Sequence, residues 1–168
     1  SFRWAATMVK MKAYFIFSVL AVFLLCGNSQ ARDQVFHCDL FSINIPSGMA
    51  IDGQENNSIS LVFEKDESLK KGTIAVTARR AKIIDLEDQW RRVRPLITSN
   101  KNVLYESETD FGNLRWKTIA VEGSNLKQVV YYSAQNNTIV MIHSHCTTGT
   151  CSAIEEATDK VIDSFKTF

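Results

Sequence analysis

Four β-rich runs separated by three or four residues place the tightest constraint on how this chain folds. The runs cover residues 102–109, 114–122, 126–134 and 138–145. Apolar and polar side chains alternate along them, as strands with one buried face require. Gly, Asn and Ser, which favour tight turns, recur in the gaps. Because parallel neighbours need crossovers of a dozen or more residues, connections this short predict an antiparallel meander.

Shorter strands precede the meander. Residues 35–45 alternate in part and stop at the turn signal Pro46-Ser47-Gly48. Residues 58–63 and 73–78 are short β-rich runs. The segment 64–72 carries charges of both signs. We therefore expect it to be a solvated connection without a functional site.

A first amphipathic helix is predicted over residues 85–97. Asp85 is expected to cap its N-terminus, and apolar residues recur at helical spacing. That stripe consists of Leu86, Trp90, Val93 and Ile97. Pro95 near the end predicts fraying or a kink from Arg94 onward.

A second helix is predicted over residues 152–168, where Ser152 and Glu155 form a capping box. Its expected buried stripe is Ile154, Ala157, Val161, Phe165 and Phe168. The predicted class is therefore α+β, a largely antiparallel β-sheet flanked by two amphipathic helices in an α/β/α sandwich.

The N-terminal region predicts export. Residues 14–25 are an apolar run of 12 residues preceded by Lys10 and Lys12. The run is shorter than the roughly 20 residues that a membrane-spanning helix needs. Because small residues stand at Ser29 and Ala31, we expect a signal peptide that is cleaved after Ala31.

The expected organisation is a signal peptide at residues 8–31 and a single α+β domain at residues 32–168. Residues 1–7 precede Met8 and have no expected role in the fold. A second interpretation stays open, in which Cys26 is lipidated and anchors the chain to a membrane, although Leu25 is not the small residue that such cleavage prefers. The predicted location is therefore periplasmic or secreted, with a membrane-anchored lipoprotein as the alternative.

The charge balance argues against nucleic acid as a partner. The whole chain has a formal net charge of +1, and loss of Arg3, Lys10 and Lys12 would leave 16 basic against 18 acidic side chains. There is no Gly/Arg-rich tract, so a nucleic-acid-binding surface is not predicted.

Basic residues are densest around the first helix. The tentative partner-binding residues are Arg79, Arg80, Arg91, Arg92 and Arg94, with Lys82 beside them. One interpretation is a solvated helix face. The other is a patch that meets an acidic protein surface or lipid headgroups.

Three cysteines follow the expected cleavage site. In an oxidising compartment two of them should be bridged. The favoured pair is Cys146 and Cys151, because the polar turn between them can bring their Cα atoms within bridging distance. A bridge from Cys38 to either of them is the competing arrangement.

No catalytic or metal site is predicted. His143 and His145 share one strand face and are weak zinc candidates with Cys146, His37 and Cys38, but their spacing matches no zinc signature, and a disulfide would consume Cys146. A Cys/His nucleophile pair lacks the turn that exposes a nucleophile. We therefore predict a protein that is not an enzyme and holds no cofactor.

The order of elements and three phrases resemble the PsbP-like family of small α/β/α sandwiches. The phrases are Phe41-Ser42-Ile43-Asn44-Ile45-Pro46-Ser47-Gly48-Met49, Thr73-Ile74-Ala75-Val76-Thr77 and Val161-Ile162-Asp163-Ser164-Phe165. In that family a strand ending in Pro-x-Gly opens the domain and a helix ending in Ser-Phe closes it. The resemblance covers residues 35–168. It implies an accessory subunit, secretion chaperone or protein-binding module, and so a protein partner.

The predicted function is that of an exported, non-catalytic protein-binding module. A narrower prediction is a periplasmic immunity protein that inhibits an antibacterial effector of a secretion system, so that the partner would be a toxin. The alternative is an envelope accessory or lipoprotein subunit that supports a larger complex. A small hydrolase or metal-binding protein is the remaining class.

Overall fold

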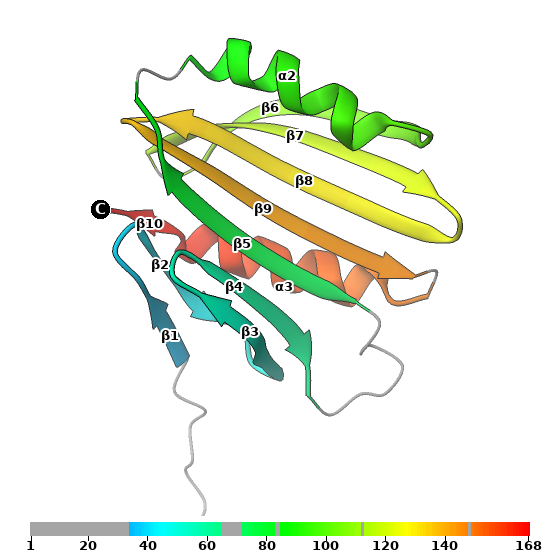
Figure 1. Cartoon of the computed structure of the whole chain (residues 1–168). Helices are drawn as coiled ribbons and strands as arrows, with labels where there is room; N and C mark the ends of the chain where they lie inside the picture. The colour runs from blue at the N-terminus through cyan, green and yellow to red at the C-terminus, as the bar shows by residue number, and fades with distance from the viewer. Residues whose placement is uncertain (1–33, 65–71, 83–84, 112, 148) are drawn as a thin grey trace, which may run out of the picture. The chain divides into compact units, whose positions relative to one another are not determined.

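The computed structural model describes residues 34–64, 72–82, 85–111, 113–147 and 149–168. Within them the chain is α+β, with two helices and mostly antiparallel sheets (Figure 1). The strands are β1 (Gln34–His37), β2 (Phe41–Ile45), β3 (Met49–Glu55), β4 (Ser58–Phe63), β5 (Thr73–Arg80), β6 (Asn102–Phe111), β7 (Leu114–Gly123), β8 (Leu126–Gln135), β9 (Thr138–Thr147) and β10 (Lys166–Thr167). The helices are α2 (Leu86–Thr98) and α3 (Cys151–Ser164).

The larger sheet has seven strands in the order β3-β4-β5-β9-β8-β7-β6, and the smaller has the order β1-β2-β10. The predicted meander is confirmed, because β6 to β9 pair in sequence and every pair is antiparallel. The β8–β9 turn places Asn136 and Asn137 at φ angles of 51° and 58°. Such left-handed pairs match the twist of the strands that they join.

The N-terminal part of the domain differs from the prediction. Residues 35–45 form two strands, because the chain reverses between them and the Cys38 amide donates to the Phe41 carbonyl at 3.0 Å. Strand β3 was not predicted, since of its residues only Met49 is buried and no apolar alternation marks it. Pairing with β4 holds it in place. Residues 65–71 of the expected solvated connection lie outside the described residues.

Helix α3 packs against β9, β2 and β5. Its buried residues Ile154 and Val161 meet branched side chains of the strands, and this forms the larger hydrophobic core. The strand residues in that core include Ile59, Leu61, Ile74, Val76, Val140 and Ile142. Each such side chain stabilises the fold by about 1.5–3 kcal/mol relative to its exposed state.

Helix α2 packs against β8 and β7. The predicted N-cap is confirmed, because Asp85 Oδ1 accepts the Asp88 amide at 2.9 Å. Leu86 and Trp90 are buried against a second core that includes Ile119, Val121 and Val130. The helix runs through Pro95 to Thr98, so the fraying predicted after Arg94 does not occur.

The start and end of α3 correct two predictions. The helix begins at Cys151 after Thr150, which makes no side-chain capping bond, so the Ser152/Glu155 capping box is wrong. Glu155 instead pairs with Lys127 of β8. The helix ends at Ser164, and Phe168 follows β10 and is exposed rather than buried.

The predicted disulfide between Cys146 and Cys151 is confirmed, with their Cα atoms 5.0 Å apart. It joins the end of β9 to the first residue of α3. Cys38 is the free cysteine among the described residues and packs against the larger core. In the part of the chain that the structure describes, none of the helices has the length and apolar character that a membrane crossing requires.

Reduction of this disulfide should lower the free energy of unfolding by about 2 kcal/mol, because the closed loop is short and constrains the unfolded chain only modestly. Urea unfolding of the wild-type protein with and without a reductant measures this change. The matched control is a Cys146→Ala/Cys151→Ala variant, whose unfolding should not respond to the reductant. A wild-type protein that is equally insensitive would contradict the prediction.

Candidate functional site

Among the described elements, β4, β5 and most of β9 have a helix packed on one side only. Along them most side chains toward α3 are buried, whereas those on the opposite side are half-buried, apart from Ile139, which is buried in the core under α2. Helix α2 lies over β7 and β8 instead (Figure 1). We define the open face as Ser58, Ser60, Thr73, Ala75, Thr77, His143 and His145. Met141, the next residue of β9 on this side, packs against the core under α2 and marks the border of the face.

The open face is polar and internally bonded. Ser58 Oγ and Thr77 Oγ1 lie 3.1 Å apart, and Thr73 Oγ1 lies 2.9 Å from His145 Nδ1. Small hydroxyl side chains tolerate water and pack closely against a partner, so the same surface suits both the free and the bound state.

The two histidines lie side by side on this face, with ring centroids 6.0 Å apart. Burial lowers the pKa of His143, and His145 and the Lys101 cation lower it further. Burial also lowers the pKa of His145. His143 Nε2 is buried and has no hydrogen-bond partner within the described residues. Both rings are therefore neutral near pH 7.

The weak metal candidates do not assemble into a larger ligand set. Cys146 points to the opposite side of β9 and is bridged to Cys151. His37 and Cys38 belong to the β1–β2 hairpin of the other sheet, where the His37 ring lies 4.8 Å from that of Phe168. No group of three or more metal-ligating side chains occurs among the residues that the structure describes.

Acidification should destabilise the protein through His143 and His145. Because their folded-state pKa values lie below the ordinary 6.5, the unfolded chain takes up protons first as the pH falls. The stabilisation is full above about pH 6.5 and is lost as the pH drops through the lowered values. Urea unfolding at about pH 7.5 and about pH 5 measures the loss.

A His143→Gln/His145→Gln variant is the comparison, and it should lose less free energy of unfolding over this interval than the wild-type protein. Burial raises the pKa of Asp159, as do the nearby Asp163 and Glu155 carboxylates. The raised pKa of Asp159 stabilises the folded state as the pH falls, which is opposite to the effect of the histidines. Asp159 is present in both proteins, so its contribution cancels in the comparison. Equal losses in the two proteins would show that the histidines do not carry the acid sensitivity.

The predicted arginines do not form a single surface, because Arg91 and Arg94 have acidic partners of their own. Arg94 Nε donates to Glu106 Oε2 at 2.9 Å, and Trp90 Nε1 donates to Glu106 Oε1 at 3.0 Å. Arg94 therefore holds α2 against the edge strand β6. Arg91 is exposed and lies 3.4 Å from Asp88 on the outer surface of the helix.

Two arginines lie next to the open face, and we call Arg79 and Arg92 the basic rim, whereas Arg80 points to the opposite side of β5. Arg79 and Arg80 are exposed at the end of β5. Glu87 and Arg94 mark the flank of α2 that faces β7 and β6. At 100° per residue Arg92 lies on the other flank, toward β9 and β5. Within the described residues the basic rim forms no ion pair.

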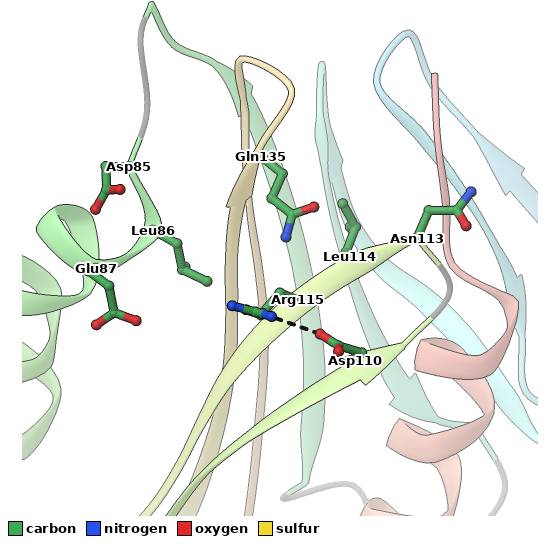
Figure 2. A pocket seen from close by; sticks show the side chains of 8 residues that line it. All are labelled: Asp85, Leu86, Glu87, Asp110, Asn113, Leu114, Arg115 and Gln135. Atoms are coloured by element: carbon green, nitrogen blue, oxygen red, sulfur yellow. Dashed lines mark hydrogen bonds and ion pairs between the residues drawn. The ribbon is translucent and has the colours of Figure 1, made fainter.

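A separate hollow of about 430 Å³ lies at the N-terminus of α2, and we call it the polar basin. Its lining residues are Asp85, Leu86, Glu87, Asp110, Asn113, Leu114, Arg115 and Gln135 (Figure 2). Arg115 forms ion pairs with two carboxylates of β6: its Nε lies 3.3 Å from Glu108 Oε1 and 3.5 Å from Asp110 Oδ1. The basin offers charged groups for recognition, and its described lining residues include no cysteine, serine or histidine.

The basic residues were predicted from the sequence, whereas the open face and the polar basin were not. The open face had a signal, since Ser, Thr and Ala alternate with Ile, Val and Leu along β4 and β5. The basin had none, because its lining comes from the N-terminus of α2 and two separate turns.

No family model matches the sequence, and no curated protein matches it. Several solved structures share the fold, including the three that follow. A Bacteroides thetaiotaomicron protein matches with a TM-score of 0.53 and 15% identity, over 76% of this chain and 45% of its own length. PsbP of the cyanobacterium Synechocystis matches with 0.55 and 10%, over 84% and 96% of the two chains. LpqN of Mycobacterium tuberculosis matches with 0.57 and 8%, over 76% and 82%.

These likenesses concern the fold, because all three identities are 15% or less. The chain spans less than half of the Bacteroides protein, whereas it covers nearly the whole of the cyanobacterial PsbP. The resemblance to the PsbP-like fold that the sequence predicted is therefore confirmed at the level of the fold.

Proposed function

We propose that this chain is an exported, non-catalytic protein-binding module, built as an α/β/α sandwich, that docks an acidic partner on its open face. The observation that carries the proposal is the half-buried, polar middle of the sheet beside the basic rim. An antiparallel sheet can leave one face without a covering layer, and a face of this kind is a surface on which a partner can pack.

The charges of the basic rim indicate what kind of partner this surface binds. Arginine guanidinium groups pair with carboxylates in a bidentate geometry, and those of Arg79 and Arg92 have no ionic partner among the described residues. Leu96 lies on the same flank of α2 as Arg92 and is 77% exposed. A partner surface that carries carboxylates and one apolar side chain would pair with these arginines and cover Leu96.

Export rests on the apolar run at residues 14–25 and the Ser29/Ala31 pair, which lie outside the described residues. The disulfide supports it, because such bridges persist in oxidising compartments. LpqN is described as involved in cell envelope biogenesis, which supports an envelope role for this fold.

The non-catalytic part of the proposal rests on where the reactive groups lie. Cys146 is bridged, and Cys38 belongs to a different sheet from His143. The cysteine–histidine pairs that the sequence offers are therefore not positioned for nucleophilic catalysis, which needs the two side chains within hydrogen-bond reach.

A narrower form of the proposal is an immunity protein, for which the acidic partner is a periplasmic toxin. The alternative is an accessory or lipoprotein subunit of an envelope complex. A tagged, exported chain that captures a partner from periplasmic extract distinguishes them: the narrower form requires that the captured protein is toxic and that binding inhibits it.

Charge reversal tests the docking surface. An Arg79→Glu/Arg92→Glu variant should slow association with the captured partner about tenfold at low ionic strength, and the effect should shrink as salt is added. Surface plasmon resonance at several salt concentrations measures the rates. The fold should survive, because both side chains are exposed.

The matched control is Lys160→Glu/Lys166→Glu, which makes the same change in net charge on α3 and β10. This control should bind like the wild-type protein. If both variants slow association equally, the change in net charge explains the slowing and the basic rim has no specific role. If the Arg79→Glu/Arg92→Glu variant associates as fast as the wild-type protein at every salt concentration, the basic rim is not the interface.

A further inference from the structure

Three hollows meet at one end of the larger sheet, where the β6–β7 and β8–β9 turns and the N-terminus of α2 lie. The first is the polar basin of about 430 Å³. The second, which we call the aromatic groove, has a volume of about 420 Å³. A smaller cleft of about 210 Å³ shares Leu114 and Gln135 with the basin and Leu114 and Phe168 with the groove. The three therefore form one continuous recessed surface.

The aromatic side of this groove offers a place for an apolar side chain. Besides its four aromatic residues, the groove is lined by Asn113, Leu114, Ile162, Asp163, Lys166 and Thr167. Trp116 and Phe165 are buried in it, in an edge-to-face contact with ring centroids 5.6 Å apart. The Trp116 indole N–H donates to the Phe111 carbonyl at 3.3 Å, so its polar group is already satisfied. Phe111 and Phe168 line the groove and are 41% and 59% exposed. A large apolar side chain inserted here would cover both rings.

The polar basin favours a positive charge. Four carboxylates lie in it or beside it, those of Asp85, Glu87, Glu108 and Asp110, whereas the cations there are Arg115 and Lys117. Two negative charges remain in excess. The N-terminus of α2 does not reverse this balance, because Asp85 already caps it and Glu87 and Asp88 occupy its first turn.

The groove and the basin lie on the two sides of the same strand. Trp116 lines the groove and Arg115 lines the basin, and adjacent residues of a strand point to opposite faces. Leu114 at the turn lines both hollows. An extended chain that crosses the sheet end over Leu114 would therefore present one side chain to each hollow.

We propose that this end of the sheet binds an extended segment of a protein partner, with a large apolar side chain in the aromatic groove and a lysine or arginine in the polar basin. Packed layers lie about 10 Å apart and an extended chain rises about 3.3 Å per residue, so the two side chains stand about three residues apart. The apolar residue acts as the anchor, as in interfaces where a few buried aromatic contacts carry most of the affinity. This surface is separate from the basic rim and does not depend on the function proposed above.

Short peptides test the proposal on the full-length chain. The probe is the acetylated and amidated tetrapeptide Phe-Gly-Gly-Arg, titrated to millimolar concentration and followed by NMR. It should produce saturable shifts of the Trp116 indole N–H and the Leu114 methyl groups. The Trp90 indole N–H is the internal control, because it is bonded to Glu106 under α2 and should not move.

Two altered probes separate the contributions. Replacing Phe by Ala should abolish the saturable shifts, and replacing Arg by Glu should weaken binding at least about fivefold, which corresponds to about 1 kcal/mol. Equal binding of the Arg and Glu probes would overturn the charge assignment. The absence of saturable shifts with Phe-Gly-Gly-Arg would overturn the proposal.

Variants place the binding on this surface. Phe111→Ala removes an exposed wall of the groove, so the fold should persist while the Phe-Gly-Gly-Arg shifts weaken at least about fivefold. Leu104→Ala removes a similarly exposed apolar side chain (42%) from the other end of β6 and is the matched control, with unchanged binding expected. If both variants bind the probe as the wild-type chain does, the aromatic groove is not its site.

Discussion

Burial of one row of branched side chains on β4, β5 and β9 against α3 is the interaction on which the rest of this structure depends. Ile74, Val76 and Ile142 have no solvent exposure, although the residues between them on the same strands are half-buried. The core gains its stability from one side of these strands. The opposite side is therefore free to carry hydroxyl groups and two neutral histidines.

The other half of the sheet shows how the molecule keeps that side open. Helix α2 is positioned over β7 and β8 by Leu86 and Trp90, and Glu106 of β6 binds both Trp90 and Arg94. Glu87 pairs with Lys117 on the same flank. These polar contacts hold α2 beside the β6 edge, so that among the described elements no helix packs on the side of β4 and β5 that faces away from α3.

Local features of the sequence were sufficient for much of the fold. The meander followed from turns of Gly and Asn, and the disulfide from two cysteines five residues apart. Predictions failed where a partner distant in the chain decides the structure. Strand β3 depends on β4, and Arg94 is held by Glu106 rather than left free for a partner. The capping box failed because the helix starts at the bridged Cys151.

The open face and the aromatic groove also differ in whether local sequence features predict them. The alternation of Ser, Thr and Ala with branched residues on β4 and β5 is visible in the sequence once period-2 faces are compared. The aromatic groove is not, because its walls come from β6, β7 and the segment after α3. Side chains this far apart in the chain meet only through the antiparallel pairing of the sheet and the packing of α3 beneath it.

The central claim is that one side of β5 and β9 is accessible in the whole protein, and solvent paramagnetic relaxation measures this directly. A soluble gadolinium chelate should broaden the methyl signals of Thr73 and Thr77 and leave those of Val76 and Ile142 sharp. That difference is expected because the threonines are half-buried and the latter two are fully covered. Equal protection of all four methyl groups would show that another part of the chain covers the open face, and would contradict the account.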